Sequence, residues 1–182
     1  MVNDIKKILF DEKILSQSIK KLGKKISEDY KDKNLLMISI LKGSIVFMSD
    51  LMRSITTHCI IDFMCASSYD GGCKTKGVIK IVKDLDISVC NHDLLIVEDI
   101  LDSGLTLQSI MNLLKNRNPK SIKICTLLDK PTKRQVDIIP DYRCLEVPDE
   151  FIVGYGFDYQ ERYRNLPFIG VLKQSVYENS AS

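Results

Sequence analysis

Residues 95–106 read Leu95-Ile96-Val97-Glu98-Asp99-Ile100-Leu101-Asp102-Ser103-Gly104-Leu105-Thr106. An apolar run that begins at Leu94 meets two adjacent acids, and a third acid follows three residues later. Apolar residues then recur at helical spacing from Leu107 to Leu114. This order predicts a buried strand at 94–97, an acidic turn, and a helix that runs to about Asn116.

The small polar residues of this stretch (Ser103, Gly104 and Thr106) indicate an anion-binding site at the start of the helix. Backbone amides at a helix N-terminus are free to bind a phosphate. Carboxylates beside it suit sugar hydroxyls, a divalent cation or a proton transfer. Strand-to-helix turns often carry one such residue as a helix cap, but a cap does not account for three acids and two hydroxyls together. Like charges at this spacing repel unless a positive group lies among them. We therefore interpret the turn as a functional site.

Composition limits the remaining classes of protein. The chain has 182 residues, 45% of them hydrophobic, which is enough for one domain with a proper core. Its net charge of +2 lacks the basic bias of a nucleic-acid binder. No apolar stretch reaches the roughly 20 residues of a membrane span, and residues 1–7 have no apolar signal core. We expect one domain, 1–182, in a cytoplasmic protein with no nucleic-acid or membrane partner.

Cysteine and histidine usage argues against a structural metal site. None of the six cysteines forms a Cys-x-x-Cys pair, and His58 and His92 have no partner at metal-ligand spacing. We therefore expect a reduced protein without structural zinc. The chain also lacks the P-loop and the Gly-x-Gly-x-x-Gly fingerprint, which disfavours an ATPase and a nicotinamide dehydrogenase.

Strands and helices alternate along the chain. The pattern predicts helices at 11–30 and 45–55, strands at 34–41, 58–65, 79–82 and 121–128, and shorter strands at 142–147 and 151–155. Several strands are apolar nearly throughout, which indicates an α/β fold with a mostly parallel central sheet flanked by helices. Residues 66–78 are polar and rich in glycine, and we expect a mobile loop there.

Binding sites of parallel sheets gather at the carboxyl ends of the strands. Lys42, Asp102 and Lys130 each follow a predicted strand closely, so we expect them to lie together. Taken alone, Lys42-Gly43 also fits an ordinary turn, and Lys130 a surface lysine.

Residues 149–167 are dense in aromatic and charged side chains. Five aromatic residues offer faces on which a flat base can stack, although most of them should belong to the core: Phe151, Tyr155, Phe157, Tyr159 and Tyr163. Asp158 and Arg164 add a metal contact and a phosphate contact.

Together these segments resemble the type I phosphoribosyltransferases, and among them the bacterial hypoxanthine (hypoxanthine-guanine) phosphoribosyltransferases. Residues 96–106 resemble the phosphoribosyl-pyrophosphate signature, and residues 41–44, 67–69, 129–131 and 153–159 carry the rest, in consistent order between about residues 35 and 173. The resemblance implies the type I fold with a small hood from both chain ends, and a homo-oligomer, either a dimer or a tetramer. It implies Mg²⁺-dependent transfer of the phosphoribosyl group from phosphoribosyl pyrophosphate to a 6-oxopurine, hypoxanthine or guanine, in purine salvage.

The resemblance also implies roles at the sugar and phosphate end. Glu98 and Asp99 hold the ribose hydroxyls, directly or through Mg²⁺, and Asp102 accepts the proton from purine nitrogen 7. The 5′-phosphate is bound by Ser103, Gly104, Leu105 and Thr106. Pyrophosphate is contacted by Lys42, Gly43 and Arg164, with a cis peptide bond between Leu41 and Lys42, and Asp158 binds a second Mg²⁺.

At the base end, Lys130 donates to the exocyclic oxygen of the purine, which selects 6-oxo over 6-amino bases. Phe151 stacks on the base, and the backbone carbonyl of Ile152 contacts its edge. Ser68 and Tyr69 cap the site as the loop closes, although Asp70 and residues 73–77 depart from the usual loop pattern.

Two alternatives remain at this point. A regulator with the same fold would bind DNA or RNA, but the chain has no room for an added DNA-binding domain and little basic bias. An enzyme of the same superfamily that uses adenine or a pyrimidine is disfavoured by Lys130 and Phe151.

Overall fold

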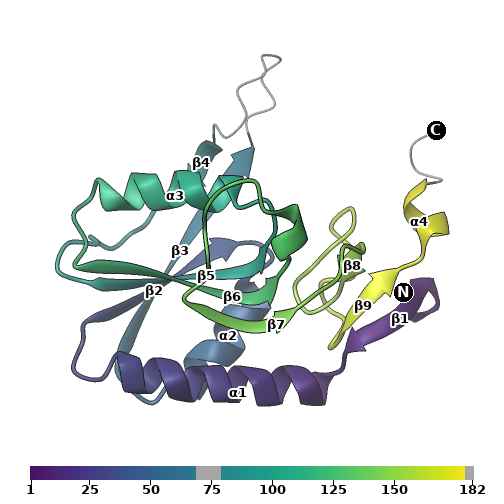
Figure 1. The fold of residues 1–182 in the computed structure, drawn as a ribbon, viewed down its shortest axis with the longest axis horizontal. Helices are drawn as coiled ribbons and strands as arrows, with labels where there is room; N and C mark the ends of the chain where they lie inside the picture. The colour runs from purple at the N-terminus through teal and green to yellow at the C-terminus, as the bar shows by residue number, and fades with distance from the viewer. Residues whose placement is uncertain (69–78, 179–182) are drawn as a thin grey trace.

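The computed structural model describes residues 1–68 and 79–178, and a six-stranded sheet of order β4-β3-β2-β5-β6-β7 forms its centre (Figure 1). The strands are β2 (Leu35–Leu41), β3 (Cys59–Ser68), β4 (Ile79–Lys83), β5 (Asp93–Leu101), β6 (Ser121–Asp129) and β7 (Tyr142–Glu146). All neighbouring strands pair in parallel except β4, which is antiparallel to β3. The predicted α/β class with a mostly parallel sheet is confirmed.

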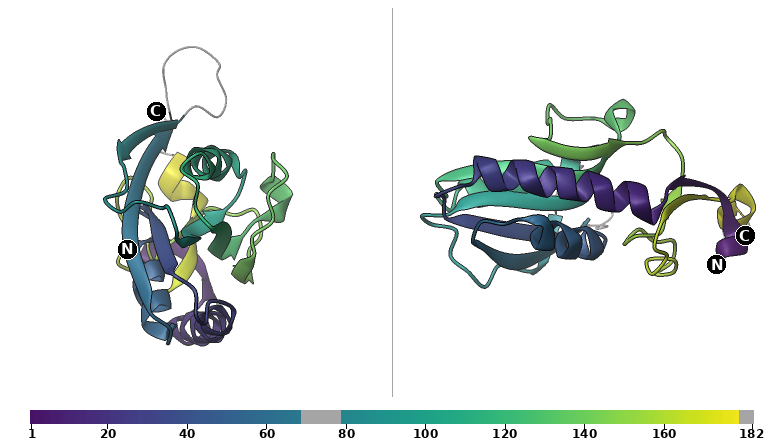
Figure 2. Two further views of the ribbon diagram at one scale, coloured as in Figure 1. Left: turned by 90° about the vertical axis from the view of Figure 1, so that its left-hand side faces the viewer. Right: turned by 90° about the horizontal axis from the view of Figure 1, so that it is seen from below.

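Helices cover both faces of this sheet (Figure 2). Leu35 and Met37 of β2 pack in one core with α1 (Glu12–Asp29) and α2 (Ile45–Ser54). Leu36 and Ile38 pack in a second core with α3 (Leu105–Lys115). Since successive side chains of a strand point to opposite faces, burial on both sides requires an unbroken apolar run.

A second, three-stranded antiparallel sheet of order β1-β9-β8 lies beside the first. It joins β1 (Ile5–Phe10), near the N-terminus, to β8 (Ile152–Val153) and β9 (Ile169–Leu172), near the C-terminus. The remaining elements are the short helix α4 (Gln174–Glu178) and the 3-10 turns η1 (Val2–Asp4) and η2 (Pro131–Lys133). Within the described part of the chain, no helix has both the length and the apolar character needed to span a bilayer.

Three boundaries differ from the sequence prediction. β3 continues to Ser68, three residues into the predicted loop at 66–78, and the rest of that loop lies outside the described residues. β5 does not end at Val97: its pairing with β2 stops there, but pairing with β6 continues to Leu101. Glu98 and Asp99 therefore belong to the strand rather than to a turn. The strand predicted at 151–155 is limited to β8, because Gly154 and Tyr155 adopt positive φ angles of 94° and 52° and leave the extended region.

Candidate active site

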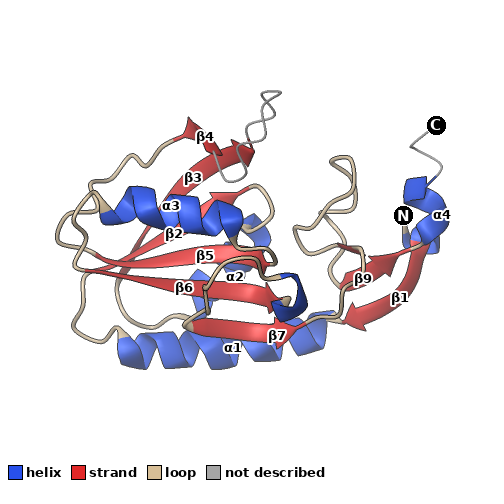
Figure 3. Cartoon of the chain, turned by 45° about the horizontal axis from the view of Figure 1, so that its top comes forward, coloured by secondary structure: helices blue, strands red, loops and turns tan. Residues whose placement is uncertain are grey.

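The carboxyl ends of β2, β5 and β6 lie at the edge of the large sheet that faces the small sheet (Figure 3). β5 carries Glu98 and Asp99 and is followed by Asp102, the turn after β2 carries Lys42 and Gly43, and Lys130 follows β6 directly. The fold thus brings the predicted residues of all three strands to one edge.

Gly43 lies between two segments of the site. A Cβ at Gly43 would stand 1.7 Å from Oδ2 of Asp99, and a Cβ at Gly156 would stand 2.1 Å from the Gly43 carbonyl oxygen. The Leu41–Lys42 peptide bond is cis, as the family resemblance predicts. Backbone without side chains therefore lies directly beside the acidic end of β5, where a ligand can approach it closely.

The acidic end of β5 is electrostatically unfavourable without a ligand. Burial raises the pKa of Glu98 well above its usual value, and the neighbouring charges of Asp99 and Asp102 raise it further. Burial also raises the pKa of Asp99 to about 6, although hydrogen bonds from backbone amides oppose the shift. Oε2 of Glu98 is buried and has no hydrogen-bond partner among the described residues. An unpaired buried acceptor of this kind calls for a donor or cation from a bound ligand.

The same donor set fits Mg²⁺ in part. Among residues 1–68 and 79–178, no three acidic, histidine or cysteine side chains lie close enough to hold a metal ion by themselves. Mg²⁺ is usually held by one or two carboxylates together with waters and substrate phosphates, not by a complete protein cage. Glu98 and Asp99 supply such carboxylates, and the unpartnered Oε2 of Glu98 is available to a metal ion or to a sugar hydroxyl.

The loop after β5 forms the start of α3. Gly104 has φ +80° and lies at the N-cap position, and no side chain caps the helix by a hydrogen bond. Amides of the first helical turn have no partner within an α-helix. The amide of Leu105 donates to Oγ of Ser103 at 3.5 Å. Ser103 accepts a hydrogen bond from the Gln135 amide at 3.0 Å, which fixes the loop from outside. The segment fits a bound phosphate.

Asp102 is exposed at the beginning of the same loop. Its Oδ1 accepts a hydrogen bond from the Ser103 amide at 2.5 Å. This contact aligns the carboxylate with the loop while the side chain stays open to solvent. An acid in this position can receive a proton from a bound base.

Lys130 follows β6 at the same edge of the sheet and is only 9% exposed. Its Nζ donates to the carbonyl oxygen of Glu150 at 3.2 Å and lies 3.6 Å from Oδ1 of Asp149. The residue after Glu150 is Phe151, which is 41% exposed. Ile152 comes next and is buried in β8. A cationic donor thus lies against the segment that carries an exposed aromatic ring.

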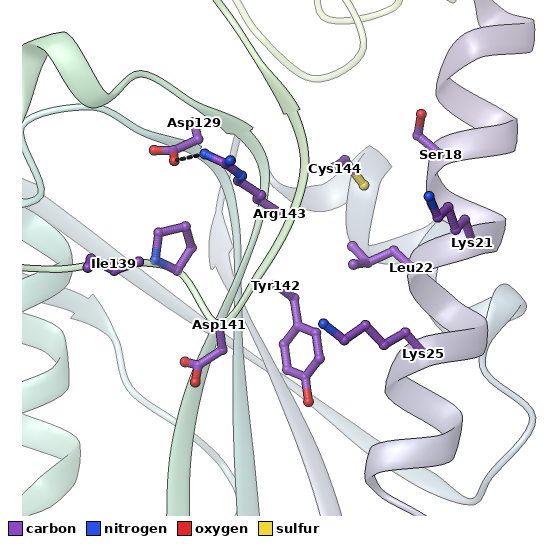
Figure 4. Close-up of a pocket in the computed structure, with 11 residues that line it drawn as sticks. Ser18, Lys21, Leu22, Lys25, Asp129, Ile139, Asp141, Tyr142, Arg143 and Cys144 are labelled. Carbon is purple, nitrogen blue, oxygen red and sulfur yellow. Dashed lines mark hydrogen bonds and ion pairs between the residues drawn. The ribbon is translucent and has the colours of Figure 1, made fainter.

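Asp129, which precedes Lys130, is held by two arginines. Its Oδ1 accepts from Nη2 of Arg134 at 2.5 Å, and its Oδ2 accepts from Nη1 of Arg143 at 3.3 Å. Figure 4 shows the second pair at the wall of a cavity of about 660 Å³ between α1 and β7. Lys21 and Lys25 extend from α1 toward this cavity, which lies outside the predicted site but shares Asp129 with the strand end that positions Lys130.

Asp158 and Arg164 form an ion pair of 2.8 Å between Oδ1 and Nη2. Nη1 of Arg164 also donates to the carbonyl oxygen of Gly156 at 2.7 Å. Arg164 is therefore hydrogen-bonded to the turn that packs on Gly43. Ser68 is the last residue of β3, and Tyr69 lies outside the described residues.

Sequence reasoning missed three residues of this region. Gly156 packs on Gly43, Glu161 contacts both Lys42 and Arg164, and Arg134 holds Asp129. Nη1 of Arg134 is buried with no hydrogen-bond partner among the described residues. The Gly-Tyr-Gly spacing at 154–156 is a signal that could have indicated Gly156, whereas Glu161 and Arg134 look like ordinary surface charges in the sequence.

A comparison with protein families finds a match to the phosphoribosyl transferase domain over residues 6–160. The chain is 52% identical over 174 residues to the hypoxanthine-guanine phosphoribosyltransferase of Streptococcus pyogenes serotype M3, covering 96% of this chain and 97% of the relative. It is 51% identical over 179 residues to the hypoxanthine-guanine phosphoribosyltransferase of Staphylococcus aureus strain Mu50, covering 98% and 100%.

Solved structures give the same result. The crystal structure of a hypoxanthine phosphoribosyltransferase from Staphylococcus aureus superposes with a TM-score of 0.94 at 51% identity, covering 97% of this chain and 96% of that one. The family match covers most of the chain, and the relatives align with nearly all of it. The chain belongs to the phosphoribosyl transferase family.

Proposed function

We propose that this enzyme transfers the 5-phosphoribosyl group from phosphoribosyl pyrophosphate to hypoxanthine or guanine, giving the nucleoside 5′-monophosphate and pyrophosphate. The choice of base rests on the position of Lys130. Its side chain is nearly buried and its ammonium group donates to the carbonyl of Glu150, the residue that precedes the exposed Phe151. A donor without acceptor capacity suits the carbonyl oxygen of a 6-oxopurine and disfavours the amino group of adenine.

The chain's own residues orient the two substrates. The first turn of α3 and the hydroxyls of Ser103 and Thr106 bind the 5′-phosphate. Glu98 and Asp99 hold the ribose hydroxyls, so that the anomeric carbon faces the base. Lys42, the Gly43 backbone and Arg164 bind the pyrophosphate that leaves. Such positioning converts an encounter of two substrates into a reaction within one complex.

Charge and proton transfer complete the reaction. Positive charge develops on the ribose as the bond to pyrophosphate breaks, and the carboxylates at the end of β5 stabilise it. Asp102 accepts the proton from nitrogen 7 of the purine. Mg²⁺, held by Glu98 and Asp99 and at a second position by Asp158, would neutralise charge on the pyrophosphate.

The base-binding end is built from Phe151, Ile152 and Lys130. Phe151 stacks on the purine, and the backbone carbonyl of Ile152 contacts its edge. Ser68 and Tyr69 cap the site. We also propose a homo-oligomer, a dimer or a tetramer, on the strength of the family resemblance; sedimentation velocity tests this assembly.

An assay with five bases tests the proposed function. The enzyme, phosphoribosyl pyrophosphate and Mg²⁺ are mixed with hypoxanthine, guanine, xanthine, adenine or uracil, and the product is followed by ultraviolet absorbance. We expect inosine monophosphate from hypoxanthine and no turnover of adenine or uracil. Turnover of adenine or uracil in preference to hypoxanthine would contradict the role of Lys130, and no turnover with any base would favour a regulatory protein.

A further inference from the structure

Lys42 and Arg164, two residues proposed to bind pyrophosphate, share one carboxylate in the ligand-free structure. Oε1 of Glu161 accepts a hydrogen bond from Nζ of Lys42 at 3.0 Å. Oε2 of the same side chain accepts from Nη2 of Arg164 at 3.2 Å and from Nε at 3.4 Å. The two cations come from distant parts of the chain and meet at this one anion.

The turn that carries Glu161 fixes its position. The Glu161 amide donates to Oδ2 of Asp158 at 2.9 Å, and Gln160 and Glu161 adopt positive φ angles of 51° and 60°. The carboxylate thus extends from a formed turn. Glu161 is not needed to hold Arg164, because the Gly156 carbonyl and Asp158 also contact that guanidinium.

The contact between Glu161 and Lys42 is open to solvent. The side chains of Glu161 and Lys42 are each 64% exposed, so water and salt weaken the contact. An exposed pair of this kind is weak enough for a multiply charged anion to replace it.

The contacts also have the geometry of anion recognition. A carboxylate offers two oxygens to cationic donors, as one phosphoryl group of pyrophosphate does. Here Oε1 of Glu161 faces Lys42, and both donors of Arg164 converge on Oε2. Glu161 therefore makes with Lys42 and Arg164 the kind of contacts that the leaving group requires.

We propose that the Glu161 carboxylate occupies the pyrophosphate position of the empty enzyme and competes with phosphoribosyl pyrophosphate and pyrophosphate for Lys42 and Arg164. This inference rests on the proposed role of those two cations. The carboxylate lowers affinity for the charged end of the donor substrate and returns to the cations as pyrophosphate leaves, so it assists product release. Binding of the purine, at the other end of the site, is independent of it.

The opposite role for Glu161 predicts an effect of opposite sign. If Glu161 served mainly to orient Lys42 and Arg164 for the substrate, its removal would weaken binding of phosphoribosyl pyrophosphate. If it competes, its removal strengthens binding. The sign of one affinity change therefore separates the two roles.

The test is Glu161→Gln, which keeps the size of the side chain and removes its charge. We expect the Kd of phosphoribosyl pyrophosphate and the inhibition constant of pyrophosphate to fall by about two- to tenfold, since exposed ion pairs each contribute little. The KM of hypoxanthine should stay within about twofold, and the gain should shrink in high salt. An unchanged or weaker affinity for both ligands would overturn the proposal.

Asp84→Asn is the matched control for the change in net charge. Asp84 pairs with Arg117 at 2.7 Å on a surface away from the catalytic edge, and its side chain is 50% exposed. This variant should leave both affinities unchanged; an equal gain from Asp84→Asn would assign the effect of Glu161→Gln to net charge and overturn the competition.

Two further variants separate this inference from the proposed function. Lys42→Ala and Arg164→Gln should each weaken binding of phosphoribosyl pyrophosphate. If neither does, the proposed pyrophosphate site fails, and the competition at Glu161 fails with it. If both do while Glu161→Gln strengthens nothing, only the competition fails.

Discussion

Gly156 packs so closely on Gly43 that a Cβ at Gly156 would stand 2.1 Å from the Gly43 carbonyl oxygen. On its other side, Gly43 contacts the Asp99 carboxylate, which a Cβ at Gly43 would approach to 1.7 Å. The turn after β2 is therefore held between the acidic end of β5 and the 154–164 segment. This packing aligns the proposed pyrophosphate and ribose contacts with each other.

The first prediction concerns Gly156→Ala. The added methyl group meets backbone rather than a flexible side chain, and Gly156 also has φ +102°, which strains any other residue. The Gly43 turn must shift, and a shift of about 1 Å in a binding group can cost on the order of 10²-fold. We expect kcat/KM for phosphoribosyl pyrophosphate to fall by roughly 10- to 100-fold in steady-state kinetics.

The exposed Asn165 provides a control in the same segment. Asn165→Ala should leave the kinetics unchanged, and thermal unfolding should show that both variants are folded. Wild-type kinetics in a folded Gly156→Ala enzyme would show that the close packing on Gly43 is not needed for substrate binding.

The second prediction concerns Lys130→Ala. Loss of a charge-assisted hydrogen bond to the base should lower kcat/KM for hypoxanthine by about ten- to hundredfold, with little change in the KM of phosphoribosyl pyrophosphate. Lys133→Ala is the matched control, because Lys133 also pairs with Asp149, at 2.7 Å, but is 53% exposed. Unchanged hypoxanthine kinetics in Lys130→Ala would remove the proposed contact with the exocyclic oxygen.

The third prediction concerns the stability of the metal-free protein. Burial raises the pKa of Glu98 in the folded state, so the folded protein holds the proton more tightly than the unfolded chain. Stability from this group is present at low pH and is lost as the pH rises toward the folded-state pKa. Glu98→Gln removes the charge, and we expect its gain in unfolding free energy to be larger at pH 8 than at pH 5.

Chemical denaturation at the two pH values measures this difference. The same variant should bind phosphoribosyl pyrophosphate more weakly, because a ribose and metal contact is lost. A stability change that is equal at both pH values would show that ionisation of Glu98 carries no cost in the folded protein.

The fourth prediction concerns removal of metal. No three acidic, histidine or cysteine side chains in the described part of the chain form a complete cage, so a bound Mg²⁺ must share its coordination with substrate and water. EDTA should therefore abolish activity at once, and excess Mg²⁺ should restore it. EDTA saturated beforehand with Mg²⁺ is the control. Full activity in free chelator would contradict the proposed role of Mg²⁺.

The β5–α3 segment could be predicted from the sequence because its signals are local. An apolar run and a helical repeat gave the strand and the helix, and only the strand's end was wrong, since continued pairing with β6 leaves no mark in the residues themselves. In the small sheet only β8 was predicted, and β1 and β9 left no comparable signal. β1 is stabilised by pairing with β9, near the other end of the chain, and Ile5 and Leu172 are register partners.

The same limit applies to the site. The strand-end positions of Asp102 and Lys130 followed from the alternation of strands and helices, and their roles from the family resemblance. The contact between Lys42 and Glu161 joins residues 119 positions apart, and Glu161 shows no periodicity or motif of its own. Only the folded chain brings these charges together.

The central claim is a division of labour within residues 95–106, in which Glu98 and Asp99 hold the ribose and metal while Asp102 receives the proton. Its most direct test is kcat and the KM of phosphoribosyl pyrophosphate for Asp102→Asn. We expect kcat to fall by about 10²- to 10⁴-fold, the usual contribution of a general base, with KM nearly unchanged. Near-normal turnover in a folded Asp102→Asn enzyme would contradict the claim.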